Sequence, residues 1–323
     1  MKVALLINRE NFDKYSAWGD AGWEFIYMGN GVPDAVAVIA TGAEAIVVDA
    51  TIKIGPEIIS KMPGLKLIHS QGVAFNAIDI DAARSAGVYV CNCAGMNAQP
   101  VAEQAVMLIL ALLKSFRHNE DMVYAGRQME AKTAYFREGL SELLGSRVGI
   151  VGFGAIGREL AARLRPFGCE IFYYEQMGDM GISGASYMPL NELYTSCDII
   201  SLHVPVTPET TDMINEETLK LFKPGAILVN TARGELMDHE AVARALISGQ
   251  LGGLCADTLA PEPFLPDNPI ISGLPEEVRR RVALSPHIAG ISAGYFARSY
   301  EHIRQNIEAV GRGERAKCIV NGL

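Results

Sequence analysis

Three side chains with complementary chemistry follow short apolar runs in the second half of the chain: Arg233, Glu262 and His287. An arginine can grip a carboxylate through two parallel hydrogen bonds and polarise an adjacent carbonyl oxygen. A histidine can exchange a proton near neutral pH, because the ordinary pKa of an imidazole is about 6.5, and a nearby carboxylate can orient and charge-stabilise the ring. Each residue alone has an ordinary structural interpretation, as an ion-pair arginine, a loop acid or a core histidine. All three interpretations would have to hold together for the site to be absent.

A glycine motif lies upstream of these residues. The apolar run at 148–151 leads into Gly152, Gly154 and Gly157, and the acidic Glu175 follows 18 positions after the last glycine. The first glycine allows a tight strand-to-helix turn, the second lets backbone approach a pyrophosphate, and the third lets the helix pack on the strand. The chain contains 32 glycines, so the spacing alone is weak evidence. The preceding strand pattern, the following helical run and the acid together predict a dinucleotide site.

The residues around Glu175 bear on the choice of dinucleotide. A carboxylate there can accept hydrogen bonds from both ribose hydroxyls. The sequence Gln176-Met177-Gly178 supplies no arginine for a 2′-phosphate. The sequence therefore favours NAD over NADP.

The apolar runs must place these residues, and they fall into two series. The first series comprises 3–7, 45–48, 65–69 and 88–91, and the second comprises 148–151, 171–174, 199–202, 227–230, 254–257 and 282–284. Short β-branched runs that alternate with helical stretches are typical of parallel α/β sheets. Because a final helical run, 293–310, lies beyond the second series, that series is expected to be inserted into the first domain. We predict two doubly wound domains, residues 1–100 plus 289–323 and residues 101–288.

Composition limits the function classes. The chain has 323 residues, 49% of them hydrophobic and 20% charged, and a formal charge of −9, which argues against nucleic acid or an anionic membrane as a partner. The longest apolar stretch, 105–113, is far short of the ~20 residues that cross a bilayer. The first residues lack the pattern of a signal peptide, so we expect a cytoplasmic protein. Six cysteines without metal-ligand spacing predict no metal site.

Five segments carry a resemblance to a known family: VGFGAIG at 151–157, SLHVPVTPET at 201–210, LVNTARGELMD at 228–238, ADTLAPEP at 256–263 and SPHIAG at 285–290. In this order and spacing the chain resembles the D-isomer-specific 2-hydroxyacid dehydrogenases, which use NAD. The N-terminal segment GVAFNAIDIDAA at 72–83 resembles the family's substrate loop less closely. It has Ala74 where a glycine is usual and Asn76 where an aspartate is usual.

The resemblance implies a Rossmann NAD-binding domain inserted into a flavodoxin-like substrate domain. It implies catalytic roles for Arg233, Glu262 and His287, with the backbone amides of Val73 and Ala74 binding the substrate carboxylate opposite Arg233. For Asp257 it implies a bond to the nicotinamide carboxamide, although a buried loop-capping role is an alternative. It also implies a homodimer formed through the segment 116–145. The complete set of expected cofactor residues is Gly152, Gly154, Ala155, Ile156, Gly157, Glu175, Val204, Pro205, Thr210, Thr231, Ala232 and Asp257.

The expected activity is hydride transfer between NAD(H) and C2 of a small 2-hydroxy or 2-oxo acid. No lysine or arginine occurs between Lys66 and Arg84 or between Arg84 and Lys114, which argues against a phosphorylated acid. The acid could be D-lactate-like, glyoxylate or hydroxypyruvate, or a larger apolar 2-oxo acid. The last is favoured if the aromatic side chains of Phe75, Tyr295 and Tyr300 line the pocket, but ordinary core packing is the alternative for these side chains.

Two further functions are compatible with the same fold. One is an NAD(H)-sensing interaction protein that resembles a corepressor and retains a dehydrogenase-like site. The other is formate dehydrogenation, against which the Glu262 and His287 pairing counts, since the formate enzymes resemble a glutamine and histidine pairing.

Overall fold

The computed structural model describes residues 1–19 and 21–323. The chain divides into two compact units: unit 1 comprises Met1–Asn97 and Ile291–Leu323, and unit 2 comprises Ala98–Gly290. Unit 2 is therefore inserted into unit 1. Within the two described ranges no helix is long and apolar enough to cross a membrane, and no group of three histidine, cysteine or acidic side chains could hold a metal ion.

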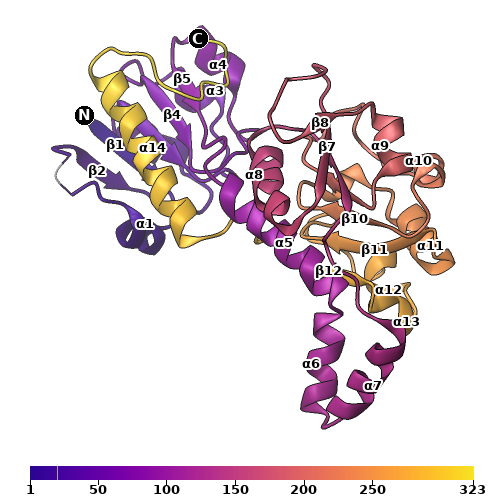
Figure 1. Ribbon diagram of the computed structural model, residues 1–323. Coiled ribbons are helices and arrows are strands. Elements are labelled where there is room, and N and C mark those ends of the chain that lie inside the picture. Colours follow the sequence, from indigo (N-terminus) through magenta and orange to yellow (C-terminus); the bar gives the residue numbers. More distant parts are fainter. Residues whose placement is uncertain (20) are drawn as a thin grey trace. The chain divides into compact units, whose positions relative to one another are not determined.

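Unit 1 contains a five-stranded sheet whose strands all run parallel (Figure 1). In spatial order the strands are β2 (Glu24–Tyr27), β1 (Lys2–Leu6), β3 (Ala45–Val48), β4 (Leu67–Ser70) and β5 (Tyr89–Cys91). This is the flavodoxin-like order that the resemblance implies. The sequence analysis did not predict β2, a short edge strand that is only partly buried, although its apolar run at 25–28 is a signal that could have been used.

Helices cover both faces of this sheet, and α14 lies along one of them (Figure 1). The helices of unit 1 are α1 (Arg9–Tyr15), α2 (Ala35–Ala40), α3 (Pro56–Ile59), α4 (Ile80–Ser85) and α14 (Ala293–Gly311). Successive strand residues point to opposite faces, so Val3 packs in the core beside α14 while Ala4 packs in the core beside α2, α3 and α4.

Unit 2 contains a seven-stranded parallel sheet. In spatial order the strands are β12 (Val282–Leu284), β11 (Leu251–Ala256), β10 (Ala226–Asn230), β9 (Ile199–Leu202), β6 (Arg147–Val151), β7 (Glu170–Tyr174) and β8 (Ser186–Tyr187). The order reverses between β6 and β9, as in a Rossmann fold. The sequence predicted six of these strands. It missed β8, which has only two residues at the sheet edge.

The helices of unit 2 are α5 (Ala98–Leu113), α6 (Phe116–Tyr124), α7 (Gln128–Glu138), α8 (Ala155–Leu164), α9 (Leu190–Ser196), α10 (Glu216–Leu221), α11 (His239–Ser248), α12 (Pro269–Ser272) and α13 (Glu276–Arg279), with 3-10 turns at Arg165–Phe167 and Gly234–Leu236. Helices α5 and α8 pack on one face of the sheet, and α9 to α13 pack on the other. The apolar run at 105–113 lies in α5, where Ala105, Leu108 and Ile109 are buried while Met107 is 46% exposed.

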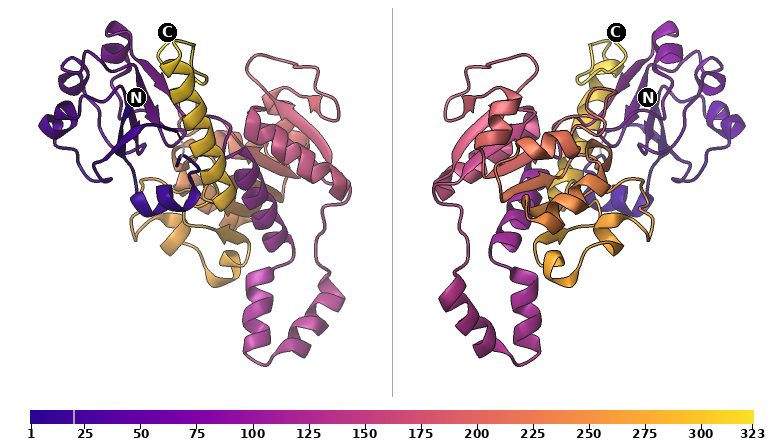
Figure 2. Two further views of the ribbon diagram at one scale, coloured as in Figure 1. Left: turned by 90° about the vertical axis from the view of Figure 1, so that its left-hand side faces the viewer. Right: turned by 90° about the vertical axis from the view of Figure 1, so that its right-hand side faces the viewer.

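The segment expected to form a dimerisation arm contains α6 and α7, which stand side by side away from the sheet in both views (Figures 1 and 2). Several of its apolar side chains are exposed, including Tyr124 at 84% and Phe136 at 81%. The homodimer itself stays a prediction.

Candidate active site

The glycine loop joins β6 to α8. Gly152 has a φ of +91°, and a Cβ added there would lie 2.6 Å from the His203 carbonyl oxygen. A Cβ on Gly157 would collide with the Gly152 carbonyl oxygen, so this glycine lets α8 pack against the loop. A Cβ on Gly154 would meet nothing within 4 Å, and the exposed Gly154 is the N-cap of α8. The loop therefore fits a pyrophosphate at the helix N-terminus, beside the N–H groups of Ala155 and Ile156.

Glu175 follows β7 and bonds to the same loop. Its Oε2 accepts a hydrogen bond from the Phe153 N–H at 2.8 Å, and its Oε1 accepts one from the Gln176 N–H at 3.1 Å. A carboxylate offers about four lone-pair sites, so Glu175 can still accept bonds from a ribose. The donor set of the loop and this acid fit a dinucleotide such as NAD.

The segment after β9 was expected on the adenine side of the cofactor. The Thr210 hydroxyl donates to the Pro205 carbonyl oxygen at 2.7 Å and accepts from the Thr207 N–H at 2.7 Å, so this side chain closes the loop around Val204 and Pro205. Nearby, His203 bonds to the Ser201 hydroxyl through Nε2 at 2.8 Å. Burial lowers the pKa of His203 to about 4, which keeps its ring neutral.

Arg233 lies in the turn after β10, beside Thr231 and Ala232. The buried Asn230 holds this turn: its Nδ2 donates to the Arg233 carbonyl oxygen at 2.8 Å, and its Oδ1 accepts from the Ala232 N–H at 3.1 Å. The Arg233 side chain is exposed and forms no ion pair with the part of the chain that the structure describes. Its Nη1 donates to the Ala232 carbonyl oxygen at 2.7 Å, and the remaining N–H groups of the guanidinium can bind an external carboxylate.

The turn that carries Arg233 packs against the loop that carries Glu262. A Cβ on Gly234 would collide with the backbone of Leu259 and Ala260, so only glycine permits this approach. The loops that carry Arg233 and Glu262 are therefore in contact within unit 2, as the sequence predicts.

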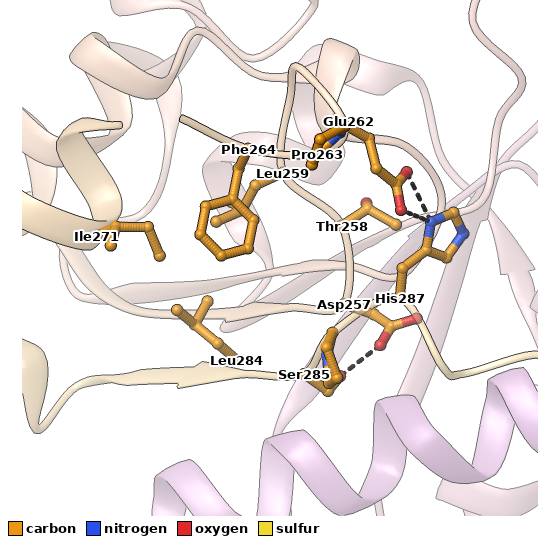
Figure 3. Close-up of a pocket in the computed structure, with 11 residues that line it drawn as sticks. Asp257, Thr258, Leu259, Glu262, Pro263, Phe264, Ile271, Leu284, Ser285 and His287 are labelled. Carbon is orange, nitrogen blue, oxygen red and sulfur yellow. Dashed lines mark hydrogen bonds and ion pairs between the residues drawn. The ribbon is translucent and has the colours of Figure 1, made fainter. Parts of the chain in front are cut away.

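Glu262 and His287 are in direct contact (Figure 3). The Nδ1 atom of His287 lies 2.6 Å from Oε1 and 2.7 Å from Oε2 of Glu262. Because an ionised carboxylate only accepts, Nδ1 is the donor in this pair. Figure 3 shows Nε2 on the opposite side of the ring, where it forms no hydrogen bond with residues 1–19 or 21–323. Nε2 is therefore the ring atom that can exchange a proton with a substrate.

Asp257 holds the backbone of the His287 loop. Only 2% exposed, it accepts through Oδ1 from the Ser285 hydroxyl at 2.5 Å and the Ile288 N–H at 3.0 Å, and through Oδ2 from the Ala289 N–H at 2.8 Å. The His287 N–H in turn donates to the Asp257 carbonyl oxygen at 2.7 Å. These are the contacts of the loop-capping interpretation. They support the φ of 56° at His287, a left-handed conformation that few non-glycine residues adopt.

A cavity of about 550 Å³ borders the Glu262 and His287 pair on the side away from Nε2 (Figure 3). Its apolar lining is formed by Leu259, Pro263, Phe264, Ile271, Leu284 and Pro286. The pair itself stays accessible to solvent, with side-chain exposures of 37% for His287 and 54% for Glu262.

The predicted substrate loop lies in unit 1 after β4. The Asn92 side chain donates to the Val73 carbonyl oxygen at 2.7 Å, and the Ser70 hydroxyl donates to the Ala74 carbonyl oxygen at 2.6 Å. The N–H groups of Val73 and Ala74 are without a hydrogen bond among the described residues. Two free amides held by fixed carbonyls can bind a carboxylate.

The aromatic side chains that were candidates for lining a pocket lie in different surroundings. Tyr300 is fully buried and packs edge-on against Phe12 and Trp18, and Phe75 packs against the other core of unit 1. Tyr295 remains near the loop, where its hydroxyl donates to the Gln71 carbonyl oxygen at 3.0 Å. The expectation of an aromatic pocket is wrong for Tyr300, which is a core residue.

Comparison with known proteins extends these observations. The sequence model of "D-isomer specific 2-hydroxyacid dehydrogenase, NAD binding domain" matches residues 106–289. The chain is 36% identical over 282 residues to a glyoxylate reductase of Thermofilum pendens, covering 86% of this chain and 81% of that protein. It is 33% identical over 288 residues to the chloroplastic/mitochondrial formate dehydrogenase of Arabidopsis thaliana, covering 88% and 71%. The solved structure of a D-2-hydroxyisocaproate dehydrogenase aligns with a TM-score of 0.85 at 27% identity, covering 100% of both chains.

Proposed function

Because the chain belongs to the D-isomer specific 2-hydroxyacid dehydrogenase family, we propose that it transfers a hydride between NAD(H) and C2 of a small unphosphorylated 2-hydroxy or 2-oxo acid. The observation that carries the proposal is the contact of Glu262 with Nδ1 of His287, which leaves Nε2 open. The names of the relatives, glyoxylate reductase above all, support a small 2-oxo acid as substrate. D-lactate-like and larger apolar acids are the other candidates.

Residues of unit 2 would hold the cofactor. Gly152, Gly154 and Gly157 shape the loop for the pyrophosphate, and Glu175 would bind the ribose. When bound, the nicotinamide would exchange a hydride with C2 of the 2-hydroxy or 2-oxo acid. Asp257 contributes by holding the loop of His287, whether or not it also contacts the carboxamide.

The charged side chains would handle the acid and the proton. Arg233 would grip the substrate carboxylate and polarise the carbonyl oxygen. During reduction His287 would give the Nε2 proton to that oxygen, and during oxidation it would take the proton back. Glu262 would fix the tautomer and the orientation of the ring throughout.

Unit 1 would supply the other contacts. We propose that the free N–H groups of Val73 and Ala74 bind the substrate carboxylate, with residues 1–100 and 289–323 serving as the substrate domain and 101–288 as the nucleotide domain. The homodimer and the cytoplasmic location stay predictions.

The test is a screen of NADH oxidation with pyruvate, glyoxylate, hydroxypyruvate, 2-oxoisocaproate and phenylpyruvate. We expect at least one acid to be reduced well, and His287→Asn to lose most of that rate. His118→Asn is a matched control, because His118 lies on α6 and has no part in the site. Equal, feeble rates on all five acids would contradict the proposal.

Two controls separate the alternatives. An NAD(H)-sensing corepressor would bind NADH, and its activity would not change in His287→Asn. Since one relative is named a formate dehydrogenase, NAD reduction with formate should be measured alongside. We expect it to be absent, because the site pairs the histidine with a glutamate that favours proton exchange.

A further inference from the structure

The sheet of unit 1 has a switch point of its own. Its order, β2-β1-β3-β4-β5, reverses between β1 and β3, and ligands of open α/β sheets bind outside the carboxyl ends of the strands at such a point. Asn8 and Asn11 follow β1, and Asp49 follows β3. The acidic side chain Asp49 is therefore at the position of the sheet where a ligand is expected.

The loop proposed to bind the substrate carboxylate lies beside Asp49. The Gln71 N–H donates to the Val48 carbonyl oxygen at 2.8 Å, which joins the end of β4 to the end of β3. A Cβ on Gly72 would lie 3.0 Å from the Cβ of Ala50, the residue after Asp49. Asp49 therefore lies beside the loop whose next two amides are proposed to bind the substrate carboxylate.

The Asp49 carboxylate has one oxygen in use and one available. Oδ1 accepts from the Thr51 N–H at 2.9 Å and the Thr51 hydroxyl at 2.7 Å. Oδ2 forms no hydrogen bond, and the carboxylate forms no ion pair, within residues 1–19 and 21–323. Tyr295 of α14, whose hydroxyl donates to this loop, has its pKa raised to about 12, mainly by burial, and the nearby Asp49 carboxylate adds a smaller rise.

The other polar side chains at this place are already bonded to one another. The Gln71 Nε2 donates to the Tyr300 hydroxyl at 2.6 Å, and that hydroxyl donates to Asn11 Oδ1 at 2.8 Å. The Tyr295 hydroxyl donates to the Gln71 carbonyl oxygen. Beside this network, Asp49 Oδ2 is the charged atom available to a ligand, and as a negatively charged acceptor it favours a donor and repels a second anionic group.

We propose that Asp49 is a specificity-determining residue that accepts a hydrogen bond from a hydroxyl on C3 of the 2-oxo acid and rejects acids with a second anionic group there. This inference rests on the proposed function and names the substrate class within it. Hydroxypyruvate carries such a hydroxyl, pyruvate lacks it, and oxaloacetate has a carboxylate instead.

The test compares kcat/KM for these three acids in the wild type, in Asp49→Asn and in Asp81→Asn. Asparagine keeps the Oδ1 bonds to Thr51 and removes the charge. Asp81 is a matched control because it is exposed on α4. A hydrogen bond to a charged group is worth about a 10- to 100-fold preference, so the wild type should favour hydroxypyruvate over pyruvate by about that factor. Asp49→Asn should reduce this ratio and raise kcat/KM for oxaloacetate, each about tenfold, and Asp81→Asn should change neither.

A second variant, Asp49→Ala, guards against a compensating bond from the asparagine amide and should lower the hydroxypyruvate to pyruvate ratio in the same direction. If both Asp49 variants reduce pyruvate normally and keep the wild-type ratios, the inference is overturned and the proposed function stands. If the wild type reduces none of these acids or the five of the earlier screen, the proposed function fails and the inference fails with it.

Discussion

The carboxyl edges of the two parallel sheets present different kinds of chemical group. In unit 2 the edge carries ionisable side chains that solvent can reach: Arg233 and Glu262 are exposed and His287 is half-buried. In unit 1 the edge carries free backbone amides, at Val73 and Ala74, and a network of neutral polar side chains with one free carboxylate oxygen.

The two edges are alike in how they are held. Buried polar residues fix each loop: Asn230 and Asp257 in unit 2, and Gln71 and Asn92 in unit 1. The groups proposed to face a ligand are at least partly exposed, while the side chains that hold them are buried and hydrogen-bonded. This division predicts that reactive residues control turnover, that holding residues in unit 2 control turnover and stability together, and that holding residues in unit 1 control substrate affinity.

The largest effect is expected at the reactive end of unit 2. His287→Asn removes the proton donor, and kcat should fall by roughly 10²- to 10⁴-fold, which is the usual contribution of general acid–base catalysis. The binding of NADH, followed by its fluorescence, should change little because the glycine loop is untouched. If His287→Asn kept the wild-type kcat, the assignment of turnover to the reactive residues of unit 2 would be contradicted.

The next effect tests the holding residue in unit 2. Asp257→Ala leaves two backbone N–H groups and the Ser285 hydroxyl without their acceptor, so the free energy of unfolding should fall by about 3 kcal/mol and kcat should fall with it. Ser285→Ala removes only one of the three bonds and should lose about 1 kcal/mol. Equal losses in the two variants, measured by urea unfolding, would argue against a capping role for Asp257.

The pH dependence of the free energy of unfolding allows the two units to be compared through one neutral histidine in each. Each unit has a neutral histidine whose ring is removed from solvent, fully for His69 and in large part for His203: burial lowers the pKa of His69 in unit 1 to about 3 and that of His203 in unit 2 to about 4. In the unfolded chain each ring takes up a proton below about pH 6.5, so the free energy of unfolding contributed by the neutral ring is present above that pH and is lost as the pH falls. For His69 the loss between pH 7 and pH 5 should approach 2 kcal/mol.

Urea unfolding of His69→Gln and His203→Gln at pH 7 and pH 5 measures this contribution unit by unit. Each variant should show a smaller drop in stability between the two pH values than the wild type, whatever its stability at pH 7. An undiminished drop in His69→Gln would mean that other groups govern the acid sensitivity of unit 1.

The smallest effect is expected at a holding residue of unit 1. Tyr300→Phe removes the hydroxyl that bonds to Gln71 and Asn11, so the free energy of unfolding should fall by about 1 kcal/mol. The loop after Gln71 would be less well ordered, so KM for the 2-oxo acid should rise about fivefold while kcat stays within about twofold. A loss confined to kcat would contradict the assignment of unit 1 to substrate affinity.

Sequence patterns predicted the reactive residues better than the buried residues that hold their loops. Continuous apolar runs mark the buried strands, and Arg233, Glu262 and His287 follow those runs, so the fold class and the contact between Glu262 and His287 could be expected. The two-residue edge strand β8 could not, because so short a segment has no distinctive period, whereas the apolar run of β2 is a signal that could have been used.

The holding residues are a different case. Asn230 ends an otherwise apolar strand, and a polar residue at such a place is a signal that could have been used. The bonds from Gln71 to Tyr300 join residues far apart in the chain, and no local pattern carries them. The same separation explains why Tyr300 was considered for a pocket although it lies in the core.

The insertion of unit 2 into unit 1 imposes an order on folding during synthesis. The strands of unit 1 emerge first, but the face made by Val3, Leu5 and Ile7 is covered only in part, by Phe12 of α1, until Tyr300, Ile303 and Ile307 of α14 leave the ribosome. Unit 2 is continuous in sequence and can complete its own sheet in the interval. The nascent chain therefore carries a finished unit 2 while one face of the unit 1 sheet is still incompletely covered, which makes unit 1 the part that chaperones would have to shield.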